Sequence, residues 1–149
     1  MIQFGHTNII TGDWKKLAHF YSTVFDCKPL FPERDLKGVW LDKATAINDA
    51  HLTGIHLALP GYGENAPTLE IFQYENNIET SLPPANRKGF GHIAFKVDDV
   101  KEMLYKVLAN GGAQVGEIVE TIIPNAGIIT FVYARDPDGN IIELQKWKR

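Results

Sequence analysis

Two histidines and two glutamates recur in a twofold order and carry most of the chemical potential of this chain. His6 lies in F-G-H-T-N-I-I and His92 in F-G-H-I-A-F-K-V, while Glu70 and Glu143 lie in the apolar segments T-L-E-I-F-Q-Y and N-I-I-E-L-Q. Two neutral imidazoles and two carboxylates neutralise a divalent cation and suit Zn, Ni, Co, Mn or Fe. Such a metal polarises a carbonyl and stabilises an enediolate, and a glutamate can act as base. The order therefore predicts one divalent metal site shared by two duplicated modules.

An internal repeat would position these four side chains. Aligning the two F-G-H motifs places Asp13 on Asp99, and each aspartate precedes an apolar pattern with helical spacing. Aspartate is a preferred N-cap residue, so the pattern predicts helices over Trp14–Phe25 and from Val100 to about Leu108.

Strand-like segments follow each predicted helix, around 39–41, 55–59 and 68–74 in the first half and around 115–123, 128–134 and 141–147 in the second. A polar stretch, 76–89, contains Pro83-Pro84 and is the expected linker between modules 1–75 and 90–149. The first half also carries extra residues, about 33–53. We predict an α+β fold in which two paired βαβββ modules form a curved mixed sheet around a metal-binding cleft.

Strand alternation places the four residues on one side of the predicted sheets, because side chains two positions apart share a face. The opposite face is apolar: Ile9, Leu69, Ile71, Ile93, Phe95, Val97, Ile142 and Leu144. Asn8 shares the face of His6, and His56 lies in the strand after the extra segment. Asn8 and His56 are therefore candidate substrate-binding residues.

Composition narrows the class of protein. The chain has 149 residues, 44% of them apolar, and a net charge of −3, which gives no electrostatic reason to expect nucleic acid or a membrane as partner. Its single cysteine, Cys27, excludes an internal disulfide and fits a buried apolar residue better than a nucleophile. We expect a cytoplasmic protein that binds a small molecule.

The motifs F-G-H-T-N-I-I, F-G-H-I-A-F-K-V-D-D-V and D-P-D-G-N-I-I-E-L resemble those of the glyoxalase/bleomycin resistance/extradiol dioxygenase superfamily, the vicinal oxygen chelate proteins. The resemblance spans essentially the whole chain. It implies paired βαβββ modules around a metal and a homodimer.

Ligand number separates the branches of that superfamily. A set of two histidines and one glutamate, matched by His6, His92 and Glu143, resembles ring-cleaving dioxygenases and fosfomycin-modifying thiol transferases. Glyoxalase I adds a carboxylate at the position of Glu70. By this resemblance Glu143 is the proton-shuttling base and a metal ligand, Glu70 is the second catalytic carboxylate, and His6 and His92 complete the metal site.

Two positions depart from the glyoxalase I pattern. The arginine and asparagine that this resemblance leads one to expect four residues after the first and second ligands are Ile10 and Tyr74 here. We therefore expect a glyoxalase-I-like lyase or isomerase, working through a metal-bound enediolate, whose substrate differs from the standard glutathione adduct. The alternatives are a three-ligand Fe or Mn dioxygenase or thiol transferase, and a non-catalytic resistance protein that binds a small molecule.

Overall fold

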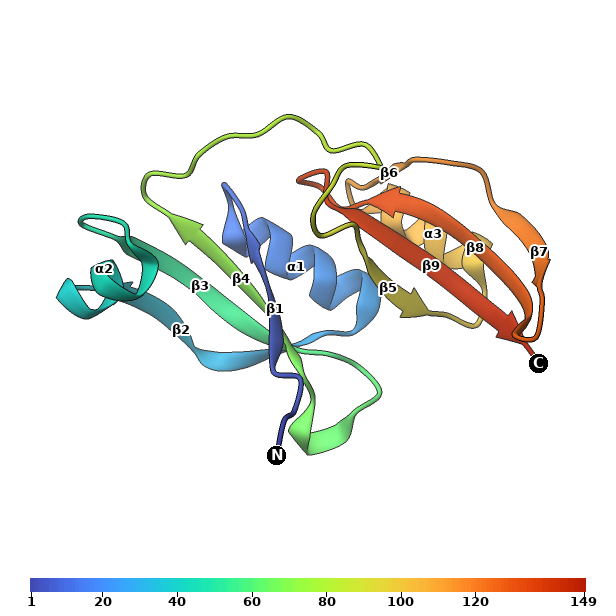
Figure 1. Cartoon of the computed structure of the whole chain (residues 1–149), viewed down its shortest axis with the longest axis horizontal. Coiled ribbons are helices and arrows are strands. Elements are labelled where there is room, and N and C mark those ends of the chain that lie inside the picture. Colours follow the sequence, from blue (N-terminus) through green and yellow to red (C-terminus); the bar gives the residue numbers. More distant parts are fainter. The chain divides into compact units, whose positions relative to one another are not determined.

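The chain folds as two compact units, Met1–Glu79 and Thr80–Arg149 (Figure 1). A computed structural model describes all residues from Met1 to Arg149. The division between the units falls in the proline-containing stretch that separates the strands of the two halves. None of the helices is both long and apolar enough to cross a lipid bilayer.

The first unit contains a four-stranded mixed sheet. Its elements are β1 (His6–Ile10), α1 (Trp14–Phe25), β2 (Lys28–Lys37), α2 (Val39–Thr45), β3 (His51–Ala58), the short 3-10 helix η1 (Gly63–Asn65) and β4 (Thr68–Tyr74). The strand order is β1-β4-β3-β2, with β1 parallel to β4 and the other pairs antiparallel.

Helix α1 has the bounds that its sequence pattern predicts. The Asp13 side chain accepts a hydrogen bond from the backbone N–H of Lys16 at 3.1 Å and so caps the first turn. Leu17, Tyr21 and Val24 form a fully buried stripe that packs against the sheet. This helix therefore covers one face of the first sheet.

Helix α2 lies where the sequence led us to expect a strand around 39–41, and that prediction is wrong. Backbone N–H groups of Leu41 and Asp42 donate to the carbonyl of Gly38, which starts a helical turn. Leu41 is the only buried residue of the helix, and it packs with Leu52 and Phe72. A single apolar anchor against the sheet thus overrides the strand preference of a short apolar run.

The second unit has a five-stranded sheet. Its elements are β5 (Ile93–Lys96), α3 (Val100–Ala109), β6 (Ala113–Gln114), β7 (Val119–Ile123), β8 (Gly127–Arg135) and β9 (Ile141–Lys148). The order is β5-β9-β8-β6, and β7 also pairs with β8. Asp99 accepts from the N–H of Glu102 at 2.9 Å, so the second helix has the aspartate cap that its sequence predicts.

A tight turn joins β8 to β9 and fixes their register. The buried Asp136 carboxylate accepts from the N–H groups of Asp138 and Asn140 and from the Asn140 side chain. Gly139 has φ 91°, and a Cβ there would lie 2.1 Å from a Leu82 methyl. The turn therefore requires glycine, and it sets which side chains of β9 oppose those of β8.

The prediction of paired βαβββ modules is confirmed, and each module carries its own mixed sheet. Leu69 and Ile71 of β4 and Ile142 and Leu144 of β9 are at most 1% exposed. Glu70 and Glu143 alternate with these buried residues along their strands. In each sheet the glutamate therefore lies on the face away from the buried side chains.

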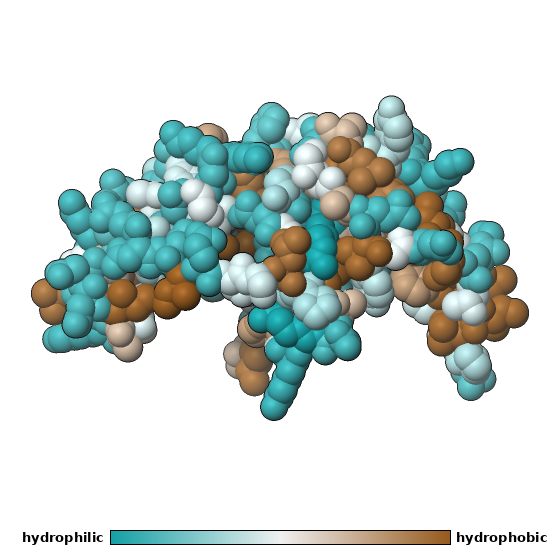
Figure 2. Space-filling model, turned by 90° about the horizontal axis from the view of Figure 1, so that it is seen from above, coloured by the Kyte–Doolittle hydropathy of each residue, from teal (hydrophilic) through white to brown (hydrophobic).

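Large apolar side chains remain exposed in both units, and Figure 2 shows brown patches interrupting the hydrophilic surface. Members of this exposed set include Phe4, Phe31 and Trp40 in the first unit and Phe90 and Ile122 in the second. Contiguous exposed apolar patches mark surfaces where proteins bind a partner or ligand.

Candidate functional site

In the first unit, two of the predicted residues, His6 and His56, lie beside the Glu70 carboxylate. His6 Nδ1 is 3.2 Å from Glu70 Oε1, and His56 Nε2 is 3.4 Å from the same oxygen. The parallel pairing of β1 with β4 sets Asn8 opposite Glu70, and the antiparallel pairing of β3 with β4 sets His56 opposite it. We call this side of the first sheet, which bears Asn8, Glu70 and His56, the site face of the first unit.

The two candidate substrate-binding residues differ in their surroundings. Asn8 Nδ2 donates to the backbone carbonyl of Glu70 at 3.0 Å, so its side chain bridges two strands at the site. Burial lowers the pKa of His56, with Arg34 and His6 contributing in the same direction and Glu70 opposing. His56 therefore favours the neutral imidazole, which is the form able to accept a proton or bind a cation.

The second unit holds the other predicted pair. His92 Nε2 is 2.8 Å from Glu143 Oε2, and only 12% of the Glu143 side chain is exposed. Glu143 lies opposite Ala94 on β5 and Tyr133 on β8. The small Ala94 side chain leaves room beside the carboxylate, and these three residues define the site face of the second unit.

Tyr133 is a neighbour of this pair that the sequence did not reveal. Its ring centroid is 5.0 Å from that of His92. Burial raises the pKa of the Tyr133 hydroxyl, and the Glu143 carboxylate adds to the rise. No motif marks Tyr133, and only the register set by the 136–140 turn places it opposite Glu143.

The structure contains His–carboxylate contacts but no preformed metal centre. No group of three or more His, Cys, Asp or Glu side chains is arranged to hold a metal ion. His6 and Glu70 form a pair in the first unit, as His92 and Glu143 do in the second. Joint binding of one metal by all four residues stays a prediction.

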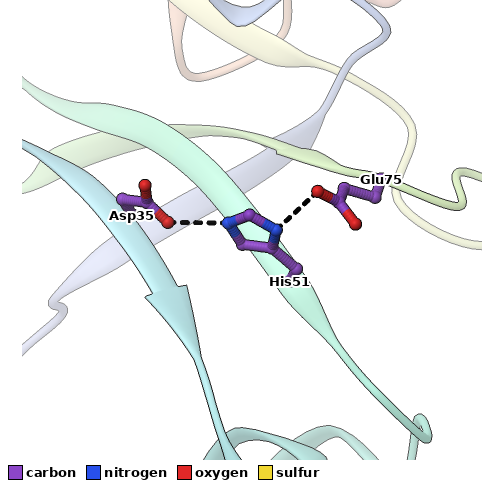
Figure 3. A network of polar contacts seen from close by, with 3 residues as sticks. All are labelled: Asp35, His51 and Glu75. Atoms are coloured by element: carbon purple, nitrogen blue, oxygen red, sulfur yellow. Dashed lines mark hydrogen bonds and ion pairs between the residues drawn. The ribbon is translucent and has the colours of Figure 1, made fainter.

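A separate histidine, His51, is held between two carboxylates of the first unit (Figure 3). Its Nε2 lies 2.7 Å from Asp35 Oδ1, and its Nδ1 lies 2.6 Å from Glu75 Oε1. The hydrogen bonds to Asp35 and then to Glu75 raise the pKa of His51. Because both ring nitrogens are engaged, this group links three chain segments and has no free nitrogen for a metal.

The single cysteine fits the apolar role expected for it. Cys27 is 2% exposed, and burial, with a smaller effect of Asp26, raises the pKa of its thiol to about 12. A thiol this weakly acidic is almost wholly protonated near neutral pH and does not act as a nucleophile.

Comparison with known proteins gives a consistent family and fold. The family model described as "Glyoxalase/Bleomycin resistance protein/Dioxygenase superfamily" matches residues 3–144. A curated relative, the "Probable lactoylglutathione lyase" of Vibrio parahaemolyticus, is 29% identical over 142 residues, covering 93% of this chain and 86% of that protein.

Solved structures show the same fold at low identity. A glyoxalase family protein from Bacillus cereus superposes with a TM-score of 0.83 at 17% identity, covering 100% of this chain and 96% of that one. The fosfomycin resistance protein FosX of Listeria monocytogenes, solved as a variant with Mn(II) and 1S,2S-dihydroxypropylphosphonic acid, gives 0.56 at 19% identity, covering 97% and 92%. Motifs, fold and family model agree, and the chain belongs to the glyoxalase/bleomycin resistance protein/dioxygenase superfamily.

Proposed function

We propose that this protein is a metal-dependent lyase or isomerase of the glyoxalase-I-like type, which transfers a proton next to a carbonyl group of a small molecule. The observation that carries the proposal is the repeated His–Glu contact, His6 with Glu70 and His92 with Glu143, on the site faces of the two units. In each unit the two strands involved are parallel neighbours. The name of the Vibrio relative supports enzymatic activity of this kind.

The donor set fits a divalent cation. Each glutamate side chain is 12% exposed, and its ion pairs are with histidines alone. A shielded carboxylate without a lysine or arginine partner gains from a metal cation, and neutral imidazoles are good ligands for the same ion. His6, Glu70, His92 and Glu143 would therefore hold the metal. When bound, the metal supplies Lewis acidity toward a substrate carbonyl.

The chain's own residues account for the proton transfer. The Glu143 carboxylate accepts a proton from the carbon next to the carbonyl and returns it to the neighbouring carbon, which is general base and then general acid catalysis. His92, 2.8 Å away, orients that carboxylate, and the Tyr133 ring lies beside the imidazole with its centroid 5.0 Å away. Glu70, in contact with His6, supplies the second carboxylate of the site.

The substrate differs from the standard glutathione adduct in this proposal. Ile10, at the position where an arginine was expected, is an apolar side chain at the end of β1 and is 45% exposed. Tyr74, where an asparagine was expected, packs against the cluster that anchors α2. Neither residue offers the charge or amide that would bind a glutathione carboxylate.

The first test is replacement of Glu143 by glutamine in protein loaded with Zn, Ni, Co or Mn. The substrates are hemithioacetals of methylglyoxal with a series of small thiols. We expect Glu143→Gln to lower kcat at least a hundredfold, within the range for loss of a general base. Glu117→Gln, an exposed glutamate, is the matched control and keeps wild-type activity. Full activity of Glu143→Gln would overturn the assignment.

A second set of measurements separates the alternatives. Glu70→Ala abolishes activity if four ligands are needed, whereas a three-ligand dioxygenase or thiol transferase that uses His6, His92 and Glu143 retains it. Metal analysis of protein purified without chelator tests the alternative that the protein only binds a small molecule. Such a protein would hold less than one metal per site and gain none on reconstitution.

We also propose that the protein acts as a homodimer. Exposed apolar residues in both units, such as Phe4 and Ile122, support this proposal because a second copy can bury them. Sedimentation equilibrium measures the mass in solution, and a monomer at micromolar concentration would contradict it.

A further inference from the structure

Arg34 lies on the site face of the first unit, although no part of the proposed chemistry uses it. Arg34 on β2 pairs with Gly54 on β3, and Gly54 pairs with Phe72 on β4. The adjacent row of the same face contains His56 and Glu70, since side chains two apart on a strand point to the same side. Arg34 therefore lies on the same face as Glu70, in the neighbouring set of cross-strand partners.

The charge of Arg34 is not neutralised by any carboxylate. None of the ion pairs of the structure includes it. One Nη1 N–H donates to the backbone carbonyl of Pro32, and the guanidinium has five N–H donors in all. The side chain is half-buried. Its charge also reaches His56, where it contributes to lowering the pKa.

The surroundings of Arg34 give this part of the face a defined shape. At Gly54 a Cβ would lie 2.5 Å from Phe72 Cδ1 and 2.0 Å from the Ile71 carbonyl oxygen, so the bare glycine lets the Phe72 ring settle over the strand. The Phe72 ring centroid is 5.6 Å from that of His56. Beyond Phe72, the anchor of α2 closes the face with apolar side chains. Arg34, with unused N–H donors, therefore lies beside the apolar surface formed by Phe72 and the cluster that anchors α2.

We propose that Arg34 binds an oxyanion, a carboxylate or phosphate-type group, on the same small molecule whose carbonyl end reacts at Glu70 and the other predicted ligands. This inference rests on the proposed function and names its substrate class, an anion-bearing hydroxycarbonyl compound. Guanidinium–oxyanion hydrogen bonds are charge-assisted and commonly bidentate, which gives geometric selectivity as well as affinity. The apolar side chains of Leu41, Leu52 and Phe72, where α2 packs on this face, limit how far the anionic end extends.

The test compares two chelators that differ in one charge. Succinic monohydroxamic acid carries a metal-chelating hydroxamate and a carboxylate, and its methyl ester lacks the carboxylate. We expect calorimetry on zinc-loaded protein to show tighter binding of the acid by about ten- to a hundredfold, as one hydrogen bond to a charged group gives. Arg34→Gln removes this preference and leaves the affinity for the ester unchanged.

Lys37→Gln is the matched control, because Lys37 is a cation of the same strand at odd spacing from Arg34 and so faces the other side. It keeps the preference. Equal affinities of acid and ester for the wild type, a preference that survives Arg34→Gln, or no binding of either compound to metal-loaded protein would overturn the proposal.

A titration without metal distinguishes failure of the proposed metal site from failure of the proposed anion site. Succinate is added to the protein without zinc, and the Arg34 Nε–H resonance is followed by NMR, identified by its loss in Arg34→Gln. A saturable shift supports the anion site even if the protein takes up no metal. An unmoved resonance overturns the anion site, whatever the metal content.

Discussion

The anchoring of α2 by one side chain predicts a large local effect of Leu41→Ala. Leu41 is 5% exposed and is the only buried residue of this seven-residue helix. The substitution removes the buried carbons beyond Cβ, at about 0.8 kcal/mol each, and leaves a small cavity, for a total of about 3 kcal/mol. So short a helix has little stability of its own, so we expect α2 to open locally before the sheet unfolds.

Hydrogen exchange followed by NMR measures this opening directly. A loss of about 3 kcal/mol speeds exchange about a hundredfold at the protected amides of α2. The amides of Asp49 and Ala50 are affected as well, because both donate to the Asp42 carboxylate of the same helix. Amides of Leu69 and Ile71, in the centre of the sheet, keep their protection.

Val39→Ala is the control, since Val39 lies in the same helix and is 69% exposed. We expect a change within about 0.5 kcal/mol for this surface substitution. Equal exchange rates in the Leu41→Ala protein and the wild type would refute the reasoning that one buried contact holds α2 in place.

Three further predictions follow from the surroundings of single residues. Asp35→Asn or Glu75→Gln should lower the pKa of His51 in an NMR titration. That pKa is raised above its usual value near 6.5. The ion pairs of His51 therefore stabilise the fold below about pH 6.5, and this stabilisation is lost as the pH rises through the raised pKa. The destabilisation caused by His51→Gln, measured by urea unfolding, should accordingly shrink as the pH rises. Cys27 should resist a thiol reagent at pH 8 in the folded protein and react once guanidinium unfolds it, since its pKa is about 12; rapid labelling of the native state would contradict this. Gly139→Ala should cost about 1–3 kcal/mol in thermal or urea unfolding because φ is 91°, and an unchanged midpoint would show that the turn relaxes.

Local sequence signals predicted much of each unit. Asp13 and Asp99 mark their helices through side-chain caps that need only a few neighbouring residues. The alternation of side chains along a strand placed Glu70 and Glu143 on the faces away from the helices. Each glutamate is next to a buried leucine, Leu69 or Leu144, and adjacent side chains of a strand point to opposite faces.

Features that depend on distant partners were missed. The run V-W-L at 39–41 has the residue types of a strand, and nothing nearby shows that Leu41 will dock on Leu52 and Phe72. Tyr133 and Arg34 also carry no local mark, since their places beside Glu143 and His56 depend on cross-strand register. The contacts within each His–Glu pair depend on register in the same way.

The parallel pairing of β1 with β4, and of β5 with β9, has a consequence for the order of events during synthesis. His6 is the first residue of β1 and His92 comes just before β5, whereas Glu70 and Glu143 lie on the last strand of their units. Asn8 and Glu70, which face each other, are 62 positions apart. Such high contact order delays the pairing until the whole unit has left the ribosome. A nascent chain therefore cannot assemble either pair early, and a chain that ends before its last strand carries histidines without their carboxylates.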